Sequence, residues 1–125
     1  PVPKEKVNWT YPRGLPTVPS SVVYDGVLYM VKDGGIITSL DASTGELLKQ
    51  GRASGSGNYY ASIVAGDGKV YVISESGVVT VLTAGRAWSI LSSSDFKERI
   101  MATPVISNGL MLIRTDLALY AFRCR

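Results

Sequence analysis

The stretch Ser20–Leu48, SSVVYDGVLYMVKDGGIITSLDASTGELL, decides the fold. It predicts three short strands, because runs of apolar and β-branched residues alternate with turn-forming dipeptides. Asp25-Gly26 separates the first two strands and suits a two-residue type I′ hairpin turn, since glycine tolerates a positive φ. Asp33-Gly34-Gly35 turns the chain again, and the third strand ends at the turn Asp41–Gly45.

The same pattern recurs twice downstream. Gly26, Gly68 and Gly109 lie 42 and 41 residues apart, and each follows an Asp or an Asn. Each of these glycines also has a valine four positions earlier and a hydroxyl residue six positions earlier. The hydroxyl residues are Ser20, Ser62 and Thr103. A period near 42 with three or four strands per unit is typical of propeller blades. A β-sandwich of about ten strands is the alternative, and the nearly constant hairpin spacing favours the propeller.

We therefore predict an all-β protein, a β-propeller fragment of about three four-stranded antiparallel blades that forms a single segment over residues 1–125. The expected units are a lead-in with a stray strand at Val7–Tyr11 (1–12), blade one (13–52), blade two (53–92) and an incomplete blade three (93–125). The fourth strand of blade two is expected at 87–91. Blade three lacks a fourth strand, which Val7–Tyr11 of the same or a partner chain could supply.

Composition narrows the class of protein. The hydrophobic content of 46% argues against disorder. The net charge of +3 comes from basic residues spread along the chain, so we expect no nucleic-acid partner. No apolar run reaches the length of a membrane-spanning helix, and Pro1–Thr10 is too polar for a signal peptide. The single cysteine, Cys124, cannot form an internal disulfide.

The segment Leu40-Asp41-Ala42-Ser43-Thr44-Gly45-Glu46, after strand–DG–strand–DG–strand, resembles the PQQ-like (quinoprotein-type) β-propeller repeat. This repeat also occurs in the BamB-like outer-membrane assembly factors. The resemblance implies the C-terminal part of a longer bacterial propeller with a periplasmic or extracellular location. The family's motif usually ends in a tryptophan that helps to lock neighbouring blades. Lys49 takes that position here, and the second unit has a degenerate motif with Trp88 shortly after it.

An enzymatic function would make the chain part of a PQQ-dependent quinoprotein dehydrogenase. That chemistry needs PQQ, a calcium ion held by oxygen ligands and a general base. The sequence has no histidine and no acidic cluster with calcium-loop spacing, and Asp41 is better explained as a turn residue that binds backbone amides. We therefore expect no catalytic residues, no metal site and no cofactor.

The preferred hypothesis is a non-catalytic binding or scaffold module for a protein or small-molecule ligand. Loops on the faces of a propeller usually carry recognition. Alignment of the repeats places Asn58 and Arg99 at equivalent positions between a loop and an inner strand, and Tyr59 and Tyr60 directly follow Asn58. Arg114 interrupts an apolar strand. We take these five residues as the candidate binding residues, since Tyr and Arg are common at binding hot spots. The simpler interpretation is that Tyr60 is a core residue and Arg99 is merely solvated.

A third hypothesis, a purely structural segment within a larger protein, is not separated from binding by the sequence. Three blades form an open arc, so we expect an apolar sheet face at each end. Such faces and the open strand edge favour a homo-oligomer.

Overall fold

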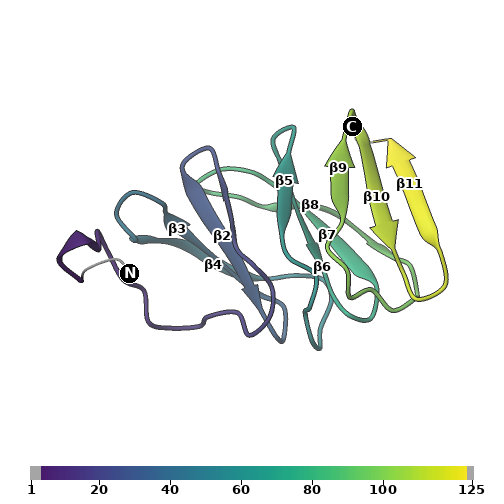
Figure 1. Cartoon of the computed structure of the whole chain (residues 1–125), viewed down its shortest axis with the longest axis horizontal. Helices are drawn as coiled ribbons and strands as arrows, with labels where there is room; N and C mark the ends of the chain where they lie inside the picture. Colours follow the sequence, from purple (N-terminus) through teal and green to yellow (C-terminus); the bar gives the residue numbers. More distant parts are fainter. Residues whose placement is uncertain (1–3, 124–125) are drawn as a thin grey trace.

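The computed structural model describes residues 4–123, and Cys124 lies outside them. The described chain is all-β apart from one 3₁₀ turn, η1 (Lys4–Lys6) (Figure 1). The strands are β1 (Val22–Tyr24), β2 (Val27–Lys32), β3 (Ile36–Asp41), β4 (Leu47–Arg52), β5 (Val64–Gly66), β6 (Lys69–Ile73), β7 (Val78–Thr83), β8 (Ile90–Asp95), β9 (Val105–Ser107), β10 (Leu110–Arg114) and β11 (Leu119–Arg123).

The strands form three antiparallel sheets that stand side by side along the long axis of the molecule (Figure 1). The sheet orders are β1-β2-β3-β4, β5-β6-β7-β8 and β11-β10-β9, so each sheet is a meander of consecutive strands. The first strands of the sheets, β1, β5 and β9, lie in a row and contact one another. This is the arrangement of propeller blades, and it confirms the expected fold over the two-sheet sandwich.

The repeated hydroxyl residues link the first strands of neighbouring blades. The backbone N–H of Ser20 donates to Oγ of Ser62 at 2.8 Å. The N–H of Ser62 in turn donates to Oγ1 of Thr103 at 2.9 Å. Each blade thus offers its hydroxyl to the same backbone position of the blade before it. The hydroxyl pattern in the sequence therefore reflects a contact between blades.

The repeated hairpin turns have the expected geometry. Asp25 and Gly26 have φ values of 52° and 79°. The corresponding pairs, Asp67-Gly68 and Asn108-Gly109, have φ values of 53° and 73° and of 50° and 76°. Positive φ at both central residues defines a type I′ turn, which matches the right-handed twist of the flanking strands.

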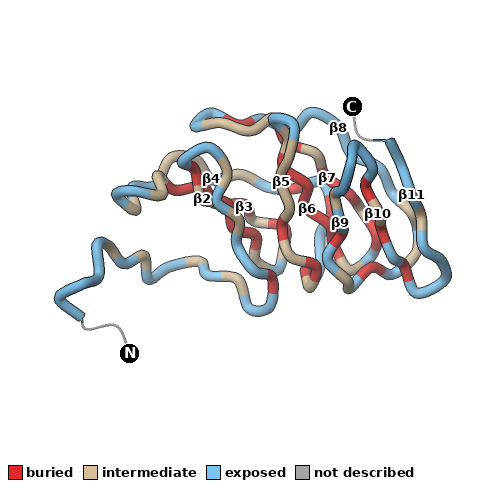
Figure 2. The backbone as a smooth tube through the Cα atoms, turned by 45° about the horizontal axis from the view of Figure 1, so that its top comes forward, coloured by how far each residue is buried: buried red, intermediate tan, exposed pale blue. Residues whose placement is uncertain are grey.

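The middle sheet is covered on both faces, and this makes the core. Side chains alternate along a strand, so Val70 and Val72 of β6 pack in one cluster with residues of the first sheet. Tyr71 and Ile73 pack in a second cluster with residues of the third sheet. Figure 2 shows that buried backbone is concentrated in the central strands, whereas β11 is largely exposed.

The two ends of the arc differ. On the third sheet, Val105, Leu110 and Leu119 are exposed on the face away from the second sheet. On the first sheet, Met30 and Leu40 face away from the second sheet but are buried. The prediction of an exposed apolar face is therefore confirmed for the third sheet and wrong for the first.

Two expected strand positions are also corrected. Val7–Tyr11 forms no strand, because a strand needs a ladder partner and none lies beside it. Instead, Nε1 of Trp9 donates to the carbonyl of Ala42 at 2.9 Å, and its ring lies against Gly45. The fourth strand of the second blade is β8 rather than 87–91, so that blade extends to Asp95 and not to 92.

Substitution of Gly26 tests the hairpin assignment. A Cβ added at Gly26 meets no atom within 4 Å, so any cost comes from the backbone conformation alone. We expect Gly26→Val to lower the free energy of unfolding by about 1–2 kcal/mol, because L-residues disfavour this left-handed conformation. Gly26→Asn is the matched control and should cost clearly less, since Asn adopts this conformation more readily. Equal urea midpoints for the two variants would contradict the turn assignment.

Candidate functional site

The connections between blades and the second turn of each blade lie at the same ends of the strands. We call this surface the crossover face. It consists of residues 33–35, 53–63, 74–77, 96–104 and 115–118. The candidate residues Asn58 and Arg99 lie within it, and Arg114 lies beside it at the end of β10. The fold therefore gathers these three residues, which are far apart in the sequence, on one side of the molecule.

Each connection is held by the turns of both blades that it joins. The N–H of Gly34 in the first blade donates to the carbonyl of Gly57 at 2.7 Å. The Asp33 carboxylate of the same turn accepts the N–H of Tyr59 at 2.8 Å. On the other side, the N–H of Glu75 in the second blade donates to the carbonyl of Asn58 at 2.9 Å. The backbone at Asn58 is thus bonded to the turns of both blades.

The next connection repeats this arrangement. The N–H of Asp116 donates to the carbonyl of Arg99 at 2.9 Å, as that of Glu75 does to Asn58. Sequence reasoning missed the acidic residues that make these turns. They lie seven positions after each hairpin glycine and are Asp33, Glu75 and Asp116. The constant offset is a signal that the repeat alignment already contained.

The two candidate tyrosines differ in burial: Tyr59 is buried and Tyr60 is half-buried. Tyr59 is 1% exposed and belongs to the core between the first two blades, where its hydroxyl donates to the carbonyl of Gly55. It supports the loop from inside and offers no binding surface. Tyr60 is half-buried, so the residue that fills the core is Tyr59 and not Tyr60.

Arg99 is exposed and paired. Its Nε and Nη2 atoms both lie 2.8 Å from Oε2 of Glu75, and the Arg99 side chain keeps 55% of its surface exposed. Arg99, Glu75 and Asn58 line an open cavity of about 420 Å³ together with Lys97 and Glu98. This cavity lies between the two connections and has a mixed-charge lining.

Arg114 lines a second, smaller cavity of about 230 Å³ that shares Arg99 with the first. Asp116 and Met101 are also in its lining. Arg114 is exposed and forms no ion pair with a carboxylate among residues 4–123. Glu75 offsets the charge of Arg99, whereas that of Arg114 has no such partner. A guanidinium of this kind binds a carboxylate through two parallel hydrogen bonds.

Glu98 lies in the connection between the second and third blades, residues 96–104, and binds side chains of the third blade. Its carboxylate accepts the hydroxyl of Thr115 at 2.7 Å and that of Tyr120 at 2.9 Å. The hydrogen bond to Glu98 raises the pKa of the Tyr120 phenol. Glu98 therefore both lines the cavity and holds the third blade through Thr115 and Tyr120.

Asp41 lies at the opposite ends of the strands and plays the expected turn role. Its Oδ1 accepts the amides of Ser43 and Thr44 at 2.8 and 3.1 Å. The hydrogen bond from Arg86 and those amides hold the pKa of this carboxyl below its usual value. Arg86 reaches Asp41 from the second blade at 2.8 Å, so the residue also ties two blades together.

The residues present do not by themselves fit the calcium site that a quinoprotein would need. Calcium takes six to eight oxygen ligands. In the part of the chain that the structure describes, no three His, Cys, Asp or Glu side chains gather to hold a metal ion. Asp33 is bonded to a backbone amide and Glu75 to an arginine.

No helix of the described chain is both long and apolar enough to span a membrane.

Comparison with known proteins shows similarity in fold rather than in sequence. No model of a protein family matches the chain, and no curated protein matches it. Among solved structures, BamB from Moraxella catarrhalis matches 82% of this chain with 16% identity and a TM-score of 0.67. The quinohemoprotein alcohol dehydrogenase ADHIIG from Pseudomonas putida HK5 matches 93% with 21% identity and a TM-score of 0.65.

A europium-containing methanol dehydrogenase matches 89% of the chain with 12% identity and a TM-score of 0.69. The chain spans 32%, 20% and 23% of the lengths of these three structures, respectively. The expected resemblance to PQQ-like propellers is thus confirmed at the level of the fold. The chain has the architecture of about three of their blades.

Tyr59 makes the free energy of unfolding depend on pH. Burial raises the pKa of Tyr59 to about 12, against about 10 in an unfolded chain. As the pH rises, the unfolded state therefore loses this proton first. The contribution of the neutral Tyr59 phenol to the free energy of unfolding is complete below pH 10 and is lost as the pH rises towards 12. We expect the stability difference between the wild type and Tyr59→Phe to narrow over this range in urea titrations. A difference that stays constant from pH 8 to pH 12 would contradict the burial of the hydroxyl.

Proposed function

We propose that the chain is a non-catalytic segment of a larger β-propeller of bacterial type, and that its crossover face binds a partner. The partner is a protein or small ligand that presents carboxylate groups. The observation that carries this proposal is Arg114, an exposed guanidinium beside Arg99 without an acidic partner of its own among residues 4–123. A periplasmic or extracellular location, which the family resemblance implied, remains part of the proposal.

The rigidity of the face supports a binding role. Asn58 and Arg99 are presented by connections whose backbone is bonded to the turns of both adjoining blades. Side chains on such a fixed loop lose less conformational entropy when they bind a ligand. The two cavities adjoin at Arg99, so one ligand can contact Asn58, Arg99 and Arg114 together.

The second candidate function is part of a PQQ-dependent dehydrogenase, because two of the structural matches are named as dehydrogenases. At 21% and 12% identity, these matches concern the fold. The residues described here supply no calcium site, so no chemical step is assigned to them. Self-association through the open edge of β11 also stays a prediction.

A pair of peptides tests the proposed function. Acetyl-hexaglutamate-amide and its glutamine counterpart are titrated separately into the ¹⁵N-labelled chain at low salt. We expect the acidic peptide alone to shift the amides of residues 97–99 and 114–116. Arg99→Gln and Arg114→Gln should each weaken its binding about two- to fivefold, because exposed charge pairs contribute up to about 1 kcal/mol. Salt at about 0.5 M should weaken it further by screening.

Arg86→Gln is the matched control, since it removes the same charge at the opposite ends of the strands. It should leave binding of the acidic peptide unchanged. Equal binding of both peptides, or an equal loss in Arg86→Gln, would contradict a specific acidic site on the crossover face. Reduction of an electron-accepting dye after addition of PQQ and Ca²⁺, with an alcohol as substrate, would instead favour the dehydrogenase.

A further inference from the structure

The hairpin turns of the second and third blades differ in what the preceding blade supplies to them. In the second blade, the N–H of Gly68 donates to the hydroxyl of Tyr24, which belongs to the first blade, at 2.8 Å. Gly66 holds the place of Tyr24 in the second blade, because each lies two residues before the glycine of its own turn. Gly66 has no side chain to reach the turn of the third blade. The N–H of Gly109, the counterpart of Gly68, accordingly forms no hydrogen bond among residues 4–123.

An exchange of large and small residues accompanies this difference. Tyr24 and Ala65 both pack against the core cluster between the first two blades. In the third blade, Ile106 takes the position of Ala65, and a Cβ added at Gly66 would lie 3.6 Å from the Cδ1 atom of Ile106. Ile106 fills space beside Gly66 but has no oxygen that could accept a hydrogen bond. The packing between the first strands is thus kept, whereas the hydroxyl that binds the turn is lost.

Asn108 directly precedes this uncovered N–H. It is exposed, and its side chain forms no hydrogen bond among residues 4–123. A Cβ added at Gly109 would meet no atom within 4 Å. Asp25 and Asp67, the counterparts of Asn108, are exposed as well, so exposure belongs to this turn in all three blades. Among the described residues, no side chain therefore shields the Asn108 amide or the nitrogen of Gly109.

An asparagine followed by glycine can lose its amide without any enzyme, and asparagine is among the thermolabile residues. The nitrogen of Gly109 gives its proton to solvent and attacks Cγ of Asn108, and the new C–N bond closes a five-membered succinimide ring. The bond from Cγ to the side-chain nitrogen breaks, and that nitrogen takes a proton from solvent and leaves as ammonia. Water then opens either C–N bond of the ring. One opening gives aspartate, and the other gives isoaspartate, in which the main chain runs through the side chain.

We propose that Asn108 is a site of spontaneous deamidation, and that Gly66 leaves it open to this reaction. The ring closes only when the turn opens locally, and exposed turns open at a small cost in free energy. A hydrogen bond donated by the N–H of Gly109 would have to break first, and no such bond holds it among residues 4–123. This site is separate from the crossover face, because the hairpin turns lie at the opposite ends of the strands.

The other two asparagines lack these features. Asn8 and Asn58 are followed by Trp9 and Tyr59, whose side chains crowd the attacking nitrogen, whereas glycine has no Cβ. The N–H of Tyr59 is also held, since it donates to the Asp33 carboxylate at 2.8 Å. These two asparagines therefore serve as controls within the same chain.

The two products should affect the third blade differently. Aspartate fits the turn, because Asp25 and Asp67 adopt it with φ values of 52° and 53°. Isoaspartate lengthens the main chain between Ser107 and Leu110, which pair across the turn. β9 is an edge strand of its sheet. Isoaspartate should therefore loosen β9 and the packing of Ile106 against the core cluster between the second and third blades.

Peptide mapping by mass spectrometry, after incubation of the folded chain in mildly alkaline buffer, tests the site. We expect the peptide that contains Asn108 to convert to aspartate and isoaspartate, while Asn8 and Asn58 keep their amides. A protein isoaspartate methyltransferase should label the incubated chain but not Asn108→Asp that has been freshly prepared. Earlier loss of the amide at Asn58 would overturn the proposal. So would an intact Asn108 in the folded chain over a period in which the urea-unfolded chain converts fully.

A matched pair of double variants tests the role of Gly66. Gly66→Tyr with Ile106→Ala rebuilds the contact between Tyr24 and Ala65 and should slow loss of the Asn108 amide about two- to tenfold, the factor expected of one net hydrogen bond. Gly66→Phe with Ile106→Ala supplies the ring without the hydroxyl and should react clearly faster than the tyrosine variant. Far-UV circular dichroism confirms that both variants are folded. Equal rates in the two variants would overturn the assignment of the open turn to Gly66.

Discussion

The structure depends on one constraint: a sheet with apolar side chains on both faces must be covered on both sides. The second blade shows this most clearly, since Val70 and Val72 pack toward the first blade while Tyr71 and Ile73 pack toward the third. A single four-stranded meander cannot meet this demand alone. Burial of a large apolar side chain stabilises a fold by roughly 1.5–3 kcal/mol, so the packing of neighbouring blades against each other contributes to stability. The order of the blades in space then follows the order of the repeats.

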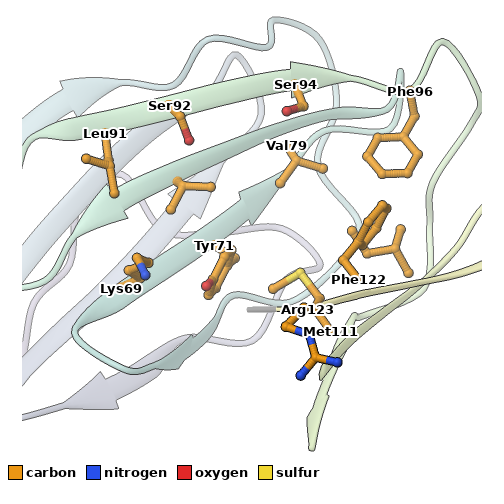
Figure 3. A pocket seen from close by; sticks show the side chains of 12 residues that line it. Lys69, Tyr71, Val79, Leu91, Ser92, Ser94, Phe96, Met111, Phe122 and Arg123 are labelled. Carbon is orange, nitrogen blue, oxygen red and sulfur yellow. The ribbon is translucent and has the colours of Figure 1, made fainter. Parts of the chain in front are cut away.

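Tryptophans contact the first blade from two different places in the chain. At the N-terminal side, Trp9 lies against Gly45 and donates to a carbonyl of the β3–β4 turn. Between the first two blades the large residue is Trp88 of the β7–β8 turn, and Lys49 both donates to its carbonyl and lies over its ring. The lysine that departs from the family pattern is therefore matched by a tryptophan across the interface. Between the second and third blades, the described residues leave an open cavity with Tyr71, Val79 and Met111 in its lining (Figure 3).

Much of the fold could be predicted because local and long-range signals agree at the hairpins. Asp25-Gly26 and its two repeats need a positive φ, and their spacing defines the blades. β8 was placed too early, because Ser92 to Ser94 are polar and resemble a connection although they pair with β7. Within the site, the repeat alignment placed Asn58 and Arg99 at loop positions, and both are exposed. Arg114 was expected at the rim because it interrupts an apolar strand, and it is exposed too. The burial of Tyr59 was not predicted, because it depends on how an irregular loop folds back onto the core.

The Trp88 ring lies against Gly51 in β4, and this stacking tests most directly the claim that neighbouring blades cover each other's faces. A proton above an aromatic ring is shielded, so the Gly51 α-protons should resonate well upfield of their usual position in the NMR spectrum. They should also show cross-relaxation with the Trp88 ring. In Trp88→Leu the upfield shift should vanish while the β3–β4 pairing persists. Gly51 α-protons at ordinary shifts, with no cross-relaxation to Trp88, would contradict the packing of the first blade against the second.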